Sequence, residues 1–228
     1  MRTWKGPNKR NWGLLKRREI FLPTLRGWLT VLLLGASLMI VVANEIHPFL
    51  ATTSPVSGGD LIVEGWVPDY ALEIAKSEFK RIPYRTMYVT GGPIGKGASL
   101  CGYATYAELG AATLRSKGLP ASLVEAVPAP EVGRDRTYTS AVALRKWQQA
   151  HGIVPGSYHV MTIGPHARRT RLLFEEALGD GAVVGITAID DPSYDSKHWW
   201  NSSEGVRTVV GESIAYVYAR LLPRQSTQ

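Results

Sequence analysis

Short apolar segments alternate with longer amphipathic segments between residues 59 and 222, and this alternation constrains the fold more than any other feature. Apolar runs of this length are typical of buried strands, and the amphipathic runs have the period of helices. Two parallel strands need a crossover of about a dozen residues, which is usually a helix. The sequence therefore predicts an α/β domain with a doubly wound, mostly parallel, five-stranded Rossmann-like sheet. We expect strands at 61–63, 86–89, 123–127, 158–163 and 182–189, and helices at 70–81, 103–117, 137–151, 166–178 and 206–222.

An uncharged apolar segment precedes this domain. Residues 27–43 contain no charged side chain, and with Asn44 they approach the length of about 20 residues that crosses a bilayer core. Residues 1–26 hold eight Lys or Arg residues and one Glu, which accounts for the whole net charge of +7. The positive-inside rule then predicts a single-pass protein of the inner (plasma) membrane, with a transmembrane helix at 27–44, a cytoplasmic N-terminus and an extracytoplasmic domain. A cleaved signal peptide ending at Ala43 is the alternative.

The rest of the composition excludes several classes of protein. Outside residues 1–26 the charges balance, so the domain shows no basic face for nucleic acid, and no nucleic-acid partner is expected. The histidines lack the spacing of a metal site, so we predict no protein-held metal. The sequence leaves the cofactor unknown, and a nucleotide-type cofactor would follow from analogy of fold alone. Cys101 has no partner for an internal disulfide. Residues 45–58 are rich in Pro, Ser, Thr and Gly and predict a linker, and residues 223–228 predict a short tail.

Polar residues follow each predicted strand. In open parallel sheets, ligands bind beyond the carboxyl ends of the strands, so these residues should gather at one edge. We expect Trp199 and Trp200, which follow the fifth strand, to form an apolar lid or a membrane-facing patch beside that edge. The candidates from the first four strands are Glu64; Thr90, Gly91 and Gly92; Arg134, Arg136 and Thr137; and His166, Arg168 and Arg169.

The stretch from His166 to Arg169 begins a predicted helix. Unpaired N–H groups and a partial positive charge at a helix start favour an anion, and arginine can bind phosphate through two hydrogen bonds. His166 is therefore a candidate donor or general acid, with Arg168 and Arg169 as anion ligands. Glu64 ends an apolar strand, where burial shifts a carboxyl group toward acid–base use. The structural alternatives are that His166 caps the helix, that both arginines pair with nearby carboxylates, and that Glu64 pairs with Arg134 or Arg136.

The order of these motifs resembles the DUF218 family, the YdcF/SanA/ElyC-like envelope proteins. The resemblance covers roughly residues 59–222. One departure is Glu64-Gly65-Trp66, which stands where the family commonly has a Gly-rich turn. The matching positions are Asp60, Thr90-Gly91-Gly92, Glu108, the Thr-rich stretch 137–140, His166 to Arg169, and Glu212.

This resemblance implies a Rossmann-like fold and an envelope role in peptidoglycan or lipid-carrier metabolism. Asp60, Glu108 and Glu212 become further candidates at the same edge, although we favour structural pairing for Glu212. We expect a phosphorylated, lipid- or sugar-linked ligand, with hydrolysis or transfer of its phosphate group if His166 and Glu64 act as acid and base. The alternative is a non-catalytic binding or scaffold module that recruits envelope-synthesis proteins through the same edge.

Overall fold

The structure, a computed structural model, describes residues 22–222; most of the basic segment (residues 1–21) and the tail 223–228 lie outside this range. The chain divides into two compact units, residues 1–41 and 42–228. Helix α1 (Leu25–Leu50) contains the predicted span and has a mean hydropathy of 2.1 over its most apolar window. Its 26 residues extend about 39 Å at 1.5 Å per residue. By length and composition it is sufficient to cross a membrane.

The last turns of α1 belong to the second unit and differ from the predicted linker. The helix continues to Leu50 because His47 and Leu50 are buried there, and this packing overrides the composition of the segment. Beyond the helix, Ser54 forms an antiparallel bridge with Ile186 through two backbone hydrogen bonds of 2.8 and 3.0 Å. The Thr53 hydroxyl also accepts a hydrogen bond from the Ala188 N–H. Residues 45–58 are therefore packed against the domain rather than free.

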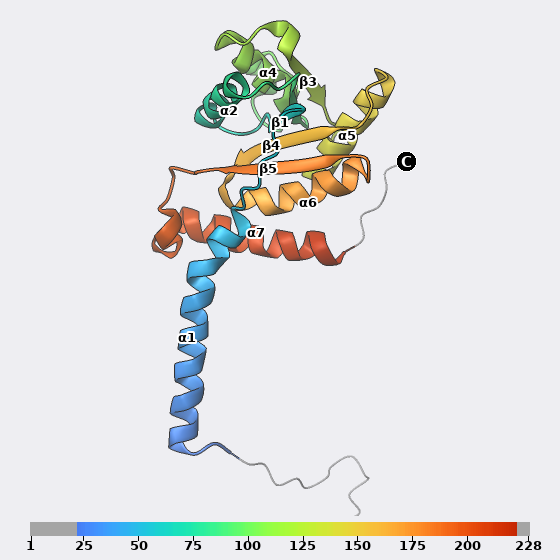
Figure 1. Ribbon diagram of the computed structural model, residues 1–228. Helices are drawn as coiled ribbons and strands as arrows, with labels where there is room; N and C mark the ends of the chain where they lie inside the picture. Colours follow the sequence, from blue (N-terminus) through green and yellow to red (C-terminus); the bar gives the residue numbers. More distant parts are fainter. Residues whose placement is uncertain (1–21, 223–228) are drawn as a thin grey trace, which may run out of the picture. The chain divides into compact units, whose positions relative to one another are not determined.

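The second unit is built on a five-stranded, all-parallel sheet, as predicted (Figure 1). The strand order is β3-β2-β1-β4-β5. The chain adds β2 and β3 on one side of β1 and then crosses back to add β4 and β5 on the other side, so the order of the strands reverses between β1 and β4. A sheet of this kind has its ligand crevice at that reversal. The strands are β1 (Asp60–Glu64), β2 (Met87–Gly91), β3 (Val124–Pro128), β4 (Ser157–Ile163) and β5 (Val183–Ile189).

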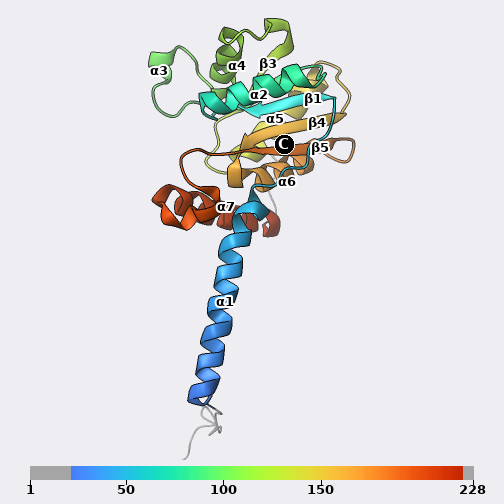
Figure 2. The ribbon, with the colours of Figure 1, turned by 60° about the vertical axis from the view of Figure 1, so that its left-hand side comes forward.

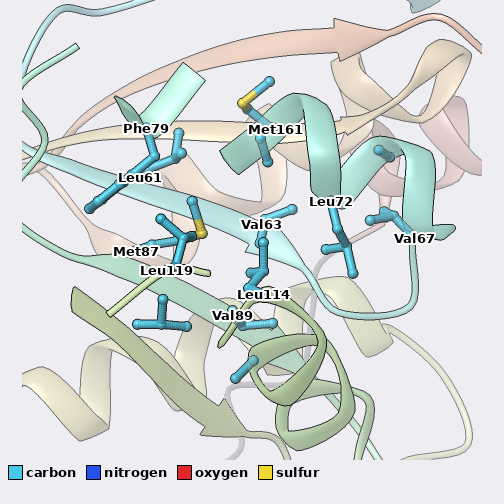
Figure 3. Packing of buried hydrophobic residues seen from close by; sticks show 14 of the residues in the cluster. Leu61, Val63, Val67, Leu72, Phe79, Met87, Val89, Leu114, Leu119 and Met161 are labelled. Carbon is cyan, nitrogen blue, oxygen red and sulfur yellow. The ribbon is translucent and has the colours of Figure 1, made fainter. Parts of the chain in front are cut away.

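Helices cover both faces of the sheet. On one face, α2 (Asp69–Arg81) and α4 (Tyr106–Ser116) pack on a core that includes Leu61, Val63 and Leu114 (Figure 3). On the other face, α5 (Arg136–Ala150) and α6 (Ala167–Leu178) cover a second core. Successive strand residues enter opposite cores, which is why the strands are largely apolar on both faces. The final helix, α7 (Ser203–Leu221), packs on α6 and not on the sheet (Figures 1 and 2).

Short helical turns connect these elements. Helix α3 (Ala98–Cys101) lies in the loop between β2 and α4, and Figure 2 shows it at the periphery of the domain. Cys101 in this turn is exposed and unpaired. The remaining turns are the 3-10 helices η1 (Ala121–Leu123), η2 (Gly164–His166) and η3 (Ser196–Asn201).

Candidate functional site

Three polar side chains lie next to one another at the carboxyl ends of β1, β2 and β4. The parallel register sets Glu64 opposite Thr90 of β2 and Val63 opposite Met161 of β4, so Thr162 is the next residue beside Glu64. Side chains two residues apart in a strand point to the same face of the sheet. The residues two positions earlier belong to the core under α5 and α6, so Glu64, Thr90 and Thr162 lie on that face. These earlier residues are Ile62, Tyr88 and Val160.

Glu64 is held at the floor of this site. Its carboxylate is buried and accepts a hydrogen bond of 2.5 Å from the Thr162 hydroxyl. Thr90 is fully buried, and its hydroxyl has no hydrogen-bond partner among the described residues. A buried polar group without a partner is unfavourable by about 1–3 kcal/mol, so this hydroxyl is free to bind a ligand.

His166 lies above Glu64 at the end of η2. Its Nε2 is 3.4 Å from Glu64 Oε2, and this nitrogen has no hydrogen-bond partner within residues 22–222. Its Nδ1 is 2.9 Å from Glu212 Oε1, which comes from α7. The indole of Trp66 meets the imidazole edge-to-face, with ring centroids 5.3 Å apart. The imidazole is therefore between two carboxylates and beneath an exposed indole.

Arg169 completes the cluster by pairing with Glu212. Its Nε and Nη2 donate to the two carboxylate oxygens of Glu212 at 2.8 and 2.9 Å. Arg169 was expected to bind an anionic ligand, but this bidentate pair engages its guanidinium group. The structural pairing favoured for Glu212 is present. Together with Glu64 and His166, these residues form a cluster of two carboxylates and two cations, which we call the ion quartet.

Each charge in the ion quartet shifts the pKa of its neighbours. Burial alone would lower the pKa of His166, but Glu64 and Glu212 outweigh it and raise the pKa to about 9. Burial alone would raise the pKa of Glu212, whereas His166 and Arg169 lower it to about 2. The pKa of buried Glu64 is also lowered, because His166 and the Thr162 hydroxyl outweigh its desolvation. All four groups are thus charged at neutral pH, and His166 Nδ1–H donates to Glu212.

These shifts predict an alkaline loss of stability. His166 has a pKa of 6.5 when unfolded and about 9 when folded, so its stabilisation is complete below pH 6.5 and disappears as the pH rises through 9. A shift of this size corresponds to about 3 kcal/mol. We expect urea unfolding of the full chain in detergent, followed by tryptophan fluorescence, to show this decrease between pH 6.5 and 9.5. His166→Gln should remove most of it, whereas exposed His151→Gln should not; equal slopes for both variants would contradict the assignment.

The start of α5 brings further predicted residues to this edge. Arg136 is its first residue, and Thr137 behind it is buried. Arg136 is exposed and makes no ion pair within the described part of the chain. Arg134 is also exposed, and its one ion pair within residues 22–222 is a 3.9 Å contact with Asp135. Asp135 adopts a left-handed conformation with φ of 56°, a strained backbone of a kind that is concentrated at functional sites.

Arg168 does not join the ion quartet. Its guanidinium lies 3.9 Å from the centroid of the Phe49 ring, and its Nε donates to the Phe49 carbonyl oxygen. Successive residues on a helix point about 100° apart, so when Arg169 faces Glu212 its neighbour must face elsewhere. Arg168 therefore fastens the end of α1 to α6, and the expectation that it binds an anion is not supported.

Two other candidates do not join the ion quartet. Asp60 begins β1, so it lies at the opposite end of that strand from Glu64, where it pairs with Arg85 at 2.9 Å. Its assignment to the same edge is wrong. Glu108 forms a capping box at the start of α4: it accepts from the Thr105 N–H at 2.9 Å, and the Thr105 side chain accepts from the Glu108 N–H. Its carboxylate stabilises the helix start and is not part of the ion quartet.

The glycines after β2 have a packing role. A Cβ at Gly91 would lie 2.8 Å from the Tyr106 Cβ, and one at Gly65 would lie 2.1 Å from the Tyr106 carbonyl oxygen. Both positions therefore let the start of α4 approach the sheet closely. Gly92 accepts a hydrogen bond from the Tyr106 N–H. The close contact explains the glycine at 91 without a ligand, whereas a Cβ at Gly92 would come no closer than 3.9 Å to other atoms, so packing does not require glycine there.

An open groove lies beside the end of β4. Two of the residues that line it, Asp191 and Glu204, are acidic, so the groove repels a phosphate group and the α5 side of the site suits one better. No group of His, Cys, Asp and Glu side chains within residues 22–222 is arranged to hold a metal ion. The groove is lined by Pro68, Tyr70, Ile163, Asp191, Pro192, Ser193 and Glu204.

The sequence did not reveal the roles of Thr162 and Trp66. Thr162 is the polar residue beside Ile163 at the end of an apolar strand, and its position two residues after Val160 was the available signal that it shares the face of Glu64. Trp66 stands two residues after Glu64, but nothing in the sequence indicated a contact with His166.

No family model, curated protein or solved structure matches this chain.

Proposed function

We propose that this chain is a single-pass membrane protein of the cell envelope, of the DUF218 type, whose extracytoplasmic α/β domain binds a phosphorylated, lipid- or sugar-linked ligand. The supporting observation is the meeting of Glu64 and His166 at the reversal of strand order between β1 and β4. Ligands of open parallel sheets bind at this place. The apolar helix α1 and the basic segment before it support the membrane anchor and its orientation.

The phosphate group would bind between the ion quartet and the start of α5. Arg136 and Arg134 supply cations that have no strong carboxylate partner within residues 22–222, and the N–H groups of the first turn of α5 add partial positive charge. The unpartnered Thr90 hydroxyl donates to a phosphate oxygen. Arg169 acts indirectly, because its bond to Glu212 holds that carboxylate against His166 Nδ1.

If the ligand is hydrolysed or its phosphate group transferred, His166 is the acid. Its Nε2–H lies 3.4 Å from Glu64 Oε2 and forms no hydrogen bond within residues 22–222, and transfer of this proton to the leaving oxygen would neutralise that oxygen. Glu64 favours the protonated imidazole and takes the proton from the attacking hydroxyl or water. Trp66 covers the imidazole, so the ligand reaches Nε2 by displacing the exposed indole.

One observation favours the non-catalytic alternative. The two carboxylates of the ion quartet balance its two cations, and a compensated buried cluster is also a common structural device. A binding or scaffold module for envelope-synthesis proteins would need the edge of the sheet and no proton transfer. A His166 variant that loses turnover but still binds the ligand would support the enzyme over the binding module.

Arg136→Ala tests the ligand-binding half of the proposal. Loss of one charged hydrogen bond weakens binding by about 1.5–3 kcal/mol, or roughly 10- to 150-fold. The measurement is binding of a polyprenyl diphosphate and of a sugar-linked diphosphate to the full chain in lipid nanodiscs. Arg81→Ala is the matched control, since Arg81 is exposed at the end of α2 and its one ion-pair partner among the described residues is Glu78 on the same helix. Equal affinity in both variants would place the phosphate elsewhere.

A further inference from the structure

Helix α7 presents an apolar stripe to its surroundings. The five residues of the stripe are spaced by four, four, three and four positions, so they follow one face of the helix. Each is at least 40% exposed, and Ile214 near the centre is 66% exposed. The α7 stripe, as we call it, consists of Val206, Val210, Ile214, Val217 and Leu221.

The opposite side of α7 is already packed. Gly205, Val209 and Ala219 are buried, and Glu212 on this side belongs to the ion quartet. A helix at the surface of a soluble protein has a polar outer face, whereas a helix that is apolar all round has apolar neighbours on all sides. A continuous exposed apolar stripe marks a surface that contacts something else.

The position of the end of α1 indicates what contacts the α7 stripe. Ala43 is the last apolar residue of the uncharged run, and its carbonyl oxygen accepts a hydrogen bond of 2.8 Å from the Trp199 indole, just before α7. Six residues further on, Phe49 meets Tyr216 of α7 edge-to-face with centroids 5.7 Å apart. Six residues rise about 9 Å, slightly more than the roughly 5–7.5 Å between the hydrocarbon core and the outer edge of the headgroups. Helix α7 thus begins and continues beside the segment in which the chain leaves the hydrocarbon.

The polar residues around the stripe fit a lipid surface. Arg207 and Arg220 are exposed along its borders, and the exposed Trp200 and Tyr218 add aromatic side chains of the kind found at interfaces. The acidic residues of α7 are Glu204 near its start and the inward Glu212, so no carboxylate lies within the stripe.

We infer that the α7 stripe lies in the interfacial layer of the membrane that α1 crosses, so that α7 rests on the bilayer as an amphipathic surface helix. This inference rests on the membrane anchoring proposed above. Because Glu212 projects from the other side of α7, the ion quartet then lies about one helix diameter, 10–12 Å, from the membrane surface. That height suits the phosphate of a lipid-linked ligand better than that of a freely diffusing one.

Site-specific fluorescence quenching tests this placement. The full chain carries Cys101→Ser and one new cysteine labelled with an environment-sensitive fluorophore, and is reconstituted into phosphatidylethanolamine–phosphatidylglycerol vesicles with or without nitroxide-labelled lipid. Ile214→Cys is the test position, with Val210→Cys as a second. Ile74→Cys is the matched control, because it is also an exposed isoleucine on a helix, but on α2 across the sheet. Leu34→Cys within α1 reports insertion of the anchor.

We expect several-fold stronger quenching by nitroxide lipid at 214 and 210 than at 74, and strong quenching by aqueous iodide only at 74. If 34 is quenched by lipid while 214 and 210 behave like 74, the inference is overturned and the anchor stands. If labelled position 214 is shielded from iodide without lipid quenching, and the unlabelled Ile214→Cys chain forms 214–214 disulfides with a mild oxidant, a second copy of the chain covers the stripe and the inference is also overturned. Absence of lipid quenching at 34 overturns the anchor and the inference together.

Discussion

Replacing Glu212 by alanine is expected to lower the free energy of unfolding of the α/β domain by about 3–5 kcal/mol. The carboxylate is the shared partner of His166 Nδ1 and of two nitrogens of Arg169. Its removal leaves two cations in contact within a largely buried site, with only Glu64 to balance them. Most of the effect comes from this uncompensated buried charge, and not from the intrinsic strength of the pair.

The measurement is urea unfolding of the full chain in detergent at pH 7. Glu175→Ala is the matched control: it removes a carboxylate that pairs with Arg171 four residues earlier on exposed α6 surface. Such a pair contributes about 0.3–0.5 kcal/mol. The pKa of His166 should also fall in Glu212→Ala, since one of the two carboxylates that raise it is gone. A loss no larger than that of Glu175→Ala would mean that the ion quartet does not hold the fold together.

The fold followed from the sequence because local signals were consistent with one another. Each apolar run became a strand and each amphipathic run a helix, with boundaries displaced by at most a few residues. Residues 45–58 behaved differently because their composition is that of a linker while burial of His47 and Leu50 holds them against the domain. Packing between distant residues has no signature in a short stretch of sequence.

The site was partly predictable for the same reason. The rule that carboxyl ends of parallel strands share an edge brought Glu64, Thr90 and His166 together. Asp60 was placed at this edge because it matches a position of the family resemblance. It begins β1, so it lies at the opposite end of that strand.

The pairing of charged residues within the site was beyond local reasoning. Arg168 and Arg169 are adjacent, and only the position of α7 decides that the second faces Glu212 and the first faces Phe49. That position depends on contacts between residues more than 40 positions apart in the sequence.

His166→Gln is expected to retain ligand binding and to lower turnover by about 10²–10⁴-fold if the domain is an enzyme. The glutamine amide can still donate a hydrogen bond at the start of α6, but it has no proton to give to a leaving oxygen. The change also removes one cation of the ion quartet, so Glu64 loses the main group that lowers its pKa. A disturbed fold is therefore a second cause of lost turnover that the experiment must separate.

A double variant separates these two causes. His166→Gln with Glu64→Gln removes one cation and one anion, which leaves the Arg169–Glu212 pair intact and restores charge balance. Recovery of stability in the double variant, with turnover still at the level of the single variant or lower, assigns the loss to chemistry. The readouts are phosphate release from lipid-linked and sugar-linked diphosphates and unfolding by urea, both on the full chain in lipid or detergent. Proton transfer by His166 is excluded if His166→Gln and the double variant release phosphate as fast as the wild-type chain. It is also excluded if the wild-type chain binds the ligand and releases no phosphate, and the ion quartet then belongs to a binding module.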